Sequence, residues 1–149
     1  MIEVSPAAWS VLVSAHAVAT LFMTGLIWFV QVVHYPLFAM VGVENAAGYA
    51  ASHQRRTTWV VAPPMLVEAL CASLLVLAVP TALSVAGLML VVVIWASTAF
   101  AMVPGHRRLL GGHDDGTVAR LVRNNWVRTV AWSLRVPVAL VLLSAPSTP

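Results

Sequence analysis

The sequence predicts an all-α integral membrane protein, a four-helix bundle with up-down-up-down topology. Apolar residues make up 60% of the 149 residues and charged residues only 9%, whereas a soluble domain has about 25% charged residues. The mean hydropathy is +0.90, so too few polar side chains exist to cover a surface that faces water, and a soluble domain is excluded. Four long apolar runs are present, and in lipid such runs form helices because every backbone group must pair within its own segment.

The four apolar runs define a single domain, 1–149. They lie at about 7–33, 59–79, 82–103 and 117–143. Each is close to the roughly 20 residues that cross about 30 Å of hydrocarbon. Ser5-Pro6 gives the first run a cap followed by proline in the first helical turn, and Pro104-Gly105 closes the third. Pro80-Thr81 leaves room for only a minimal turn, so we expect the second and third helices to form a tight antiparallel hairpin.

The basic residues predict the orientation in the membrane. All eight are arginines, and six of them fall in the two segments 34–58 and 104–125. The opposite side of the four runs has no basic residue. By the positive-inside rule both segments are cytoplasmic and both termini lie outside, in the inner (cytoplasmic) membrane of the cell. The pI near 10.0 therefore indicates topology and contact with membrane lipid, and we expect no nucleic-acid partner.

Charged residues inside the apolar runs require a partner. Arg135 lies midway along the fourth run, where an arginine costs at least about 2.5 kcal/mol on insertion scales. Asn125, Arg128, Trp132 and Arg135 fall on one helical stripe, which must face the bundle interior. Glu68 is the only acid in an apolar run, so we expect a Glu68–Arg135 or Glu68–Arg128 contact and neighbouring second and fourth helices. Such a pair fixes helix register or forms a polar cavity for proton transfer or anion binding; Arg128 alternatively snorkels to the interface.

Histidines on the cytoplasmic side are candidate metal ligands. His34, His53 and His106 come first, with His113 and Glu68 as further candidates, and imidazoles suit iron, copper or zinc. No HxxH or HxH pair fixes two ligands locally, so the cofactor stays open as iron, copper or none. His16 lies about 27 Å from His34 along the helix, and we expect it to be an inward-facing, hydrogen-bonded residue. The lone Cys71 excludes an intramolecular disulfide.

Two stretches carry a resemblance to a known family. Phe100–Leu109, and then Arg123-Asn-Asn-Trp-Val-Arg-Thr129, resemble the anthrone oxygenase-like family of small four-span membrane proteins. In that family the third span ends in a proline-containing polar turn and the fourth opens with N-x-x-R-T, which Asn125, Arg128 and Thr129 match. The Tyr35-Pro36 step is also similar, whereas Gly105-His106 stands where Leu-Asn is expected. The resemblance implies a four-helix bundle and, for a few members, oxygenation of a polycyclic aromatic phenol or anthrone without an obvious cofactor.

These residues predict an integral membrane oxidoreductase or oxygenase acting on a hydrophobic, lipid-partitioned substrate at a polar site on the cytoplasmic side. The candidate catalytic residues are Asn125, Arg128, Glu68 and Arg135. Arg128 and Asn125 would bind an enolate or phenolate oxygen, because a guanidinium stays ionised and presents a planar fork. A histidine would serve as base or metal ligand. The alternative is a non-catalytic accessory subunit or transporter component whose polar residues set helix packing; a homo-oligomer is open in both cases.

Overall fold

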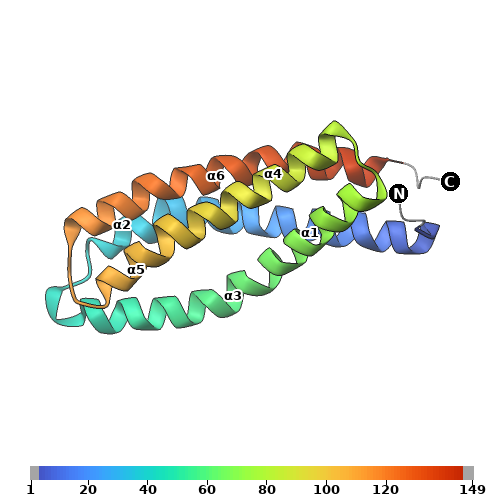
Figure 1. The fold of residues 1–149 in the computed structure, drawn as a ribbon. Coiled ribbons are helices and arrows are strands. Elements are labelled where there is room, and N and C mark those ends of the chain that lie inside the picture. The colour runs from blue at the N-terminus through green and yellow to red at the C-terminus, as the bar shows by residue number, and fades with distance from the viewer. Residues whose placement is uncertain (1–3, 146–149) are drawn as a thin grey trace.

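The computed structural model describes residues 4–145 as a bundle of four antiparallel helical spans (Figure 1). The spans are Pro6–Phe38 (α1 Pro6–Phe29, η1 Val30–His34, α2 Tyr35–Phe38), Val43–Ala78 (α3), Ala82–Leu109 (α4 Ala82–Ser97, η2 Thr98–Met102, α5 Val103–Leu109) and Asp115–Ser144 (α6). All four are long and apolar enough to cross a membrane. The all-α four-helix bundle is confirmed, and the chain is a multi-pass membrane protein.

Local sequence sets where the helices begin. The hydroxyl of Ser5 accepts a hydrogen bond from the Ala8 N–H at 3.3 Å, with proline in the first turn of α1. Thr81 and Ser84 form a reciprocal capping box at the start of α4, which closes the expected tight hairpin. Asp114 caps α6 by accepting from the Thr117 N–H at 3.1 Å. Each cap satisfies backbone donors that the first helical turn leaves free.

The helices extend further than the apolar runs predict. The long loops expected at 34–58 and 104–125 are reduced to the short breaks 39–42 and 110–114. Both breaks lie at one end of the bundle, here called the loop end, opposite the described ends of the chain (Figure 1). Pro36 and Pro104 fail to stop their spans, because each lies in a first turn directly after a π-helical segment. A π segment already displaces the regular hydrogen-bonding pattern, so the missing proline N–H is accommodated.

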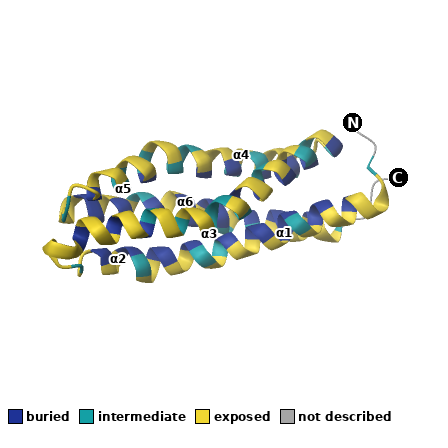
Figure 2. Cartoon of the chain, turned by 90° about the horizontal axis from the view of Figure 1, so that it is seen from below, coloured by how far each residue is buried: buried dark blue, intermediate teal, exposed yellow. Residues whose placement is uncertain are grey.

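The order of the helices around the bundle corrects one prediction. α1 packs on α3, α3 on α4, α4 on α6 and α6 on α1, whereas within residues 4–145 the backbones of α3 and α6 stay apart. The second and fourth spans are therefore diagonal to each other. The expectation that they are neighbours, which was based on the Glu68–Arg135 pairing, is wrong. The inner faces of the four spans are buried and their outer faces exposed, as a lipid-facing bundle requires (Figure 2).

Two apolar clusters fill the core, with a polar layer between them. One cluster lies toward the loop end and includes Met23, Ile94 and Trp132. The other lies toward the opposite end and includes Leu75 and Trp9. Trp9 is thus a buried packing residue of this cluster. Along every helix the polar layer falls between the two clusters, so it lies deep in the bundle.

Candidate functional site

The polar layer joins all four spans through one buried guanidinium. Arg135 is fully buried and donates hydrogen bonds to Glu68 Oε1 at 3.4 Å and to the Gly87 carbonyl at 2.6 Å. Arg135 Nη2 also lies 3.1 Å from His16 Nε2 and donates to the Thr20 hydroxyl at 3.3 Å. The Trp132 indole completes the layer by donating to Glu68 Oε2 at 2.9 Å. The predicted Glu68–Arg135 contact and the inward-facing His16 are confirmed.

The pair meets across the diagonal because both side chains are long. Glu68 and Arg135 line neither of the two cavities described below. Their polar atoms are taken up by each other and by His16, Thr20 and Trp132. Because Glu68 and Arg135 bond to each other and to these neighbours, the structure does not bring them into the pocket at the loop end.

A pocket of about 290 Å³, here called the inner pocket, lies between α3 and the η2–α5 part of the third span. Most of its lining surface is apolar, and its apolar residues are Met23, Leu26, Ile27, Val30, Val61, Met65, Met102 and Val103. Its polar groups come from Tyr35, His53, Gln54, Thr57, Thr58, Thr98, His106, Arg107 and Arg128. Thr58 and Val103 are exposed, so the pocket reaches the outer surface of the bundle between α3 and α5. Both π segments contribute residues to it, and π segments are frequent at functional sites.

Arg128 is a buried cation without an acidic partner. It is 6% exposed, and its Nε is enclosed with no hydrogen-bond partner among the described residues. No carboxylate in 4–145 forms an ion pair with it. Its guanidinium carbon lies 5.1 Å from the ring centroid of Trp132, a cation–π arrangement. Arg128 therefore faces the inner pocket, and the alternative that it snorkels to the interface is wrong.

Three histidines converge beside Arg128. His34 Nε2 is 2.8 Å from His53 Nδ1, and the His53 and His106 ring centroids are 5.0 Å apart. His106 Nε2 is 2.9 Å from the Tyr35 hydroxyl. His53 lies on the part of α3 expected to be a loop, and His106 lies beyond Pro104, so the unexpected helical extensions position this cluster.

The cluster is hydrogen-bonded and lacks the arrangement of a metal site. Within residues 4–145, no three His, Cys, Asp or Glu side chains are grouped so that they could hold a metal ion. The 2.8 Å between His34 Nε2 and His53 Nδ1 is a direct hydrogen bond, shorter than the roughly 3.4 Å that separates two tetrahedral zinc ligands at about 2.1 Å. His113 lies apart in the loop and bonds Asp115 at 2.9 Å. The predicted ligand set is therefore not supported.

Asn125 belongs to a different network from Arg128. Its amide nitrogen donates to Gln31 Oε1 at 2.9 Å, Thr129 donates to the same oxygen at 3.3 Å, and Gln31 donates to the Val122 carbonyl at 3.1 Å. Asn125 is fully buried and does not line the inner pocket. The three residues of the N-x-x-R-T pattern therefore have two different roles. Asn125 and Thr129 hold η1 against α6, and Arg128 alone lines the pocket. Only the Tyr35-Pro36 step pointed to Tyr35 beforehand, and nothing singled out Thr57 as part of the site.

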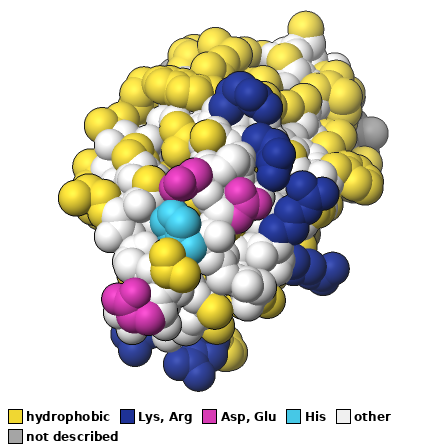
Figure 3. All heavy atoms as spheres, turned by 90° about the vertical axis from the view of Figure 1, so that its left-hand side faces the viewer, with side chains coloured by type: hydrophobic (Ala, Val, Ile, Leu, Met, Phe, Trp, Pro, Cys, Tyr) yellow, Lys and Arg dark blue, Asp and Glu magenta, His cyan; other side chains and the backbone are white. Residues whose placement is uncertain are grey.

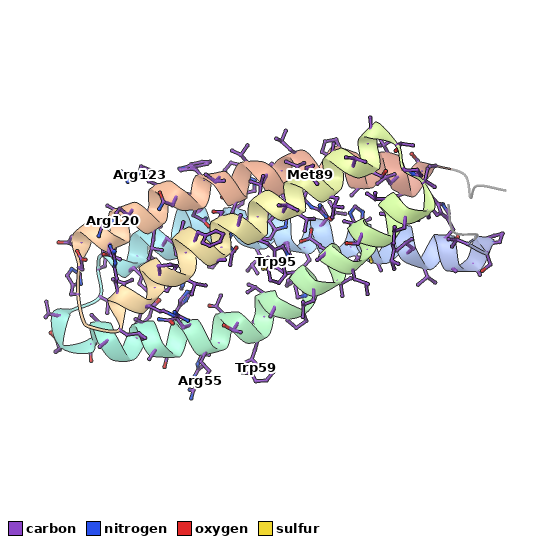
Figure 4. The ribbon with its side chains drawn as sticks, in the orientation of Figure 1. Arg55, Trp59, Met89, Trp95, Arg120 and Arg123 are labelled. Carbon is purple, nitrogen blue, oxygen red and sulfur yellow. The ribbon has the colours of Figure 1, made fainter. Side chains whose placement is uncertain are left out.

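The exposed arginines gather at the loop end. Arg55 and Arg56 of α3, Arg107 and Arg108 of α5, and Arg120 and Arg123 of α6 are all exposed. Figure 3 shows the basic side chains spread around this end of the molecule. In Figure 4 Arg55, Arg120 and Arg123 lie toward it, and Trp59 points away from α3. The described part of the chain has no basic residue at the opposite end, so the charge asymmetry read from the sequence is present in three dimensions.

Comparison with protein-family models, with curated proteins and with solved structures finds no match to this chain. The fold and the pocket define the class: a four-span helical membrane protein with a cation-containing pocket that opens at the outer surface of the bundle. The resemblance carried by Asn125, Arg128 and Thr129 stays an expectation from the motif.

Proposed function

We propose that the protein is an integral membrane oxidoreductase of the oxygenase type that binds a lipid-partitioned phenol or enol as its oxyanion at Arg128. One observation carries the proposal: a buried guanidinium without a carboxylate partner lines a mainly apolar pocket. Burying an unpaired charge is costly, and an anionic ligand at this point offsets the cost. In a dry pocket a fixed cation also stabilises developing negative charge far better than water does.

The size and the lining of the inner pocket support a hydrophobic aromatic substrate. Its volume of about 290 Å³ is near the lower limit of about 300 Å³ for small-molecule sites. Met23, Met65 and Met102 line it, and methionine sulfur makes favourable contacts with aromatic rings. A substrate dissolved in the bilayer reaches the pocket sideways, between α3 and α5, without crossing the aqueous phase.

The residues of the pocket support proton removal followed by reaction with dioxygen. His53 accepts the proton, and Arg128 holds the resulting oxyanion in place. For an anthrone-type substrate, the electron-rich enolate reduces dioxygen: one oxygen atom becomes the new carbonyl of the ring, and the other leaves as water with the two hydrogens lost from carbon. The Tyr35 hydroxyl, held by His106, orients the oxygen of the substrate. Asn125, Glu68 and Arg135 position the helices and do not touch the substrate.

Binding of 4-nitrophenol to the detergent-purified protein tests the oxyanion site, because its phenolate absorbs visible light. At a pH below the pKa of the free probe, the wild-type protein should produce the phenolate band. Arg128→Gln should weaken this binding about 10- to 100-fold, the equivalent of a charged hydrogen bond of about 1.5–3 kcal/mol. Arg123→Gln, an exposed change on the same helix, is the matched control.

Oxygen uptake with 1,8-dihydroxyanthrone tests the reaction itself. The wild-type protein and Arg123→Gln should accelerate uptake over buffer with detergent, and Arg128→Gln should not. The non-catalytic alternative makes the opposite prediction: Arg128→Gln alters stability, while neither phenolate binding nor oxygen uptake depends on the residue. An unchanged phenolate band in Arg128→Gln would refute the assignment of the oxyanion site.

A further inference from the structure

His53 stands between two cavities. It lines the inner pocket and also an outer cavity of about 390 Å³, formed by His34, Tyr49, Ser52, His53, Arg56 and Thr57. Ser52 and Arg56 are exposed, so the outer cavity opens at the surface of the loop end. His53 and Thr57 line both cavities, so these two side chains lie between the inner pocket and this surface.

The two imidazoles are connected in series. His53 Nδ1 and His34 Nε2 share a hydrogen bond of 2.8 Å, and the Thr57 hydroxyl lies 3.1 Å from the same His53 nitrogen. Among the described residues, neither His53 Nε2 nor His34 Nδ1 has a hydrogen-bond partner, and neither is among the enclosed polar atoms. Each ring thus uses one nitrogen for the bond between the rings, and its other nitrogen is accessible and without a partner among the described residues.

We propose that His53 and His34 form a proton relay that connects the inner pocket with the aqueous phase at the loop end; the relay rests on the proposed function for the source of its proton. The substrate proton forms an N–H bond at His53 Nε2 while the Nδ1–H bond of His53 breaks. That proton passes to His34 Nε2, and the Nδ1 proton of His34 is released to water. No electrons are transferred, and proton flow in the reverse direction restores the starting tautomers.

The other buried histidines have no such outlet. His106 uses Nε2 for the Tyr35 hydroxyl, and its Nδ1 is enclosed without a partner. His16 Nδ1 is likewise enclosed, within the polar layer. A proton taken up by either ring cannot leave through its second nitrogen. The structure therefore separates a relay pair, His53 and His34, from the positioning residue His106.

Charged and titratable groups surround the relay from each neighbouring element. They are Tyr35 on α2, Tyr49 and Arg56 on α3, His106 and Arg107 on α5 and Arg128 on α6. Three of these are cations, and no carboxylate lies among them. A proton that stayed on the pair would be repelled by these cations, which favours its release to water over storage on the rings.

Stopped-flow mixing with 4-nitrophenol tests the relay through the rate at which the bound phenolate and the released proton appear. His34→Gln should slow both by about 10²-fold, the lower end of what a positioned proton-transfer group supplies, while the final amplitude stays unchanged. His34→Ala should regain speed when imidazole is added, because the base enters the outer cavity. His113→Gln, a loop histidine outside both cavities, is the matched control.

A second variant leaves both histidines in place. Ser52→Trp fills the mouth of the outer cavity from an exposed position, so it should fold and should also slow proton release. Wild-type rates in His34→Gln or in Ser52→Trp would overturn the relay. If the wild-type protein produces no phenolate band, the proposed function fails, and exchange of the His53 imidazole proton with water, followed by nitrogen-15 NMR, decides the relay. Slower exchange in His34→Gln supports it, and unchanged exchange overturns it.

Discussion

Replacing Glu68 by glutamine removes the carboxylate that neutralises Arg135 in the polar layer. The Arg135 guanidinium is 0% exposed and the Glu68 side chain 3% exposed, so water cannot take over the role of the lost charge. The amide oxygen of the introduced glutamine can still accept the hydrogen bond of the Trp132 indole, which reaches Glu68 Oε2 at 2.9 Å in the native chain. The substitution therefore removes the negative charge of Glu68 with little change in the shape of the side chain.

The expected loss of unfolding free energy follows from the removal of that charge. Breaking one partner of a buried ion pair costs about 3–5 kcal/mol, whereas hydrogen bonds between membrane helices average about 0.6 kcal/mol and reach about 1.7 kcal/mol. Arg135→Met should be similarly destabilising, because it leaves Glu68 unpaired. In Glu68→Gln/Arg135→Met neither charge remains, so we expect a coupling energy of at least about 2 kcal/mol. Recovery stays partial, because Gly87, His16 and Thr20 lose their donor.

A double-mutant cycle in mixed micelles, with unfolding free energies from steric trapping, measures this coupling. Arg123→Met is the control on the same helix, and an exposed substitution of this kind should change stability by no more than about 0.5 kcal/mol. A coupling energy below about 1.7 kcal/mol would place the contact among ordinary interhelical hydrogen bonds. Additive losses would refute the view that charge pairing across the diagonal stabilises the bundle.

Three other predictions concern packing, capping and orientation. Gly105→Ala should cost about 1–3 kcal/mol in thermal unfolding, because a Cβ atom there would lie 2.6 Å from Leu121 Cδ2; Gly48→Ala meets no atom within 4 Å and should be neutral or stabilising. The hydroxyl and N–H of Thr117 lower the pKa of the Asp114 carboxyl, so the cap of α6 stabilises above the unfolded-state pKa and is lost as pH falls through the lowered one. Hydrogen exchange in the first turn of α6 should report this loss, and Asp114→Asn should remove the pH dependence. Cysteines placed at Ser52 and Gly111 should resist an impermeant reagent added outside intact cells; labelling there would reverse the proposed orientation.

Composition and local chemistry determined much of the architecture. Few charges and long apolar runs require membrane-spanning helices, whatever their packing, because lipid cannot satisfy backbone groups. The caps at Ser5, Thr81 and Asp114 act within one turn, and the one at Ser5 was predicted from the sequence. The Glu68–Arg135 contact was also predictable, since each is the natural partner of the other at that depth.

Tertiary structure decided which side chains meet in the pocket. An apolar run marks the hydrocarbon region and not the length of the helix, so the extensions that carry His53 and His106 were expected to be loops. Helical periodicity places Asn125 and Arg128 on one stripe, but it does not say which neighbour each one meets. That depends on the π segments, which bring Gln31 to Asn125 and leave Arg128 facing the pocket. Contacts across a bundle depend on how every helix is rotated and bent, and this information is not contained in any single segment.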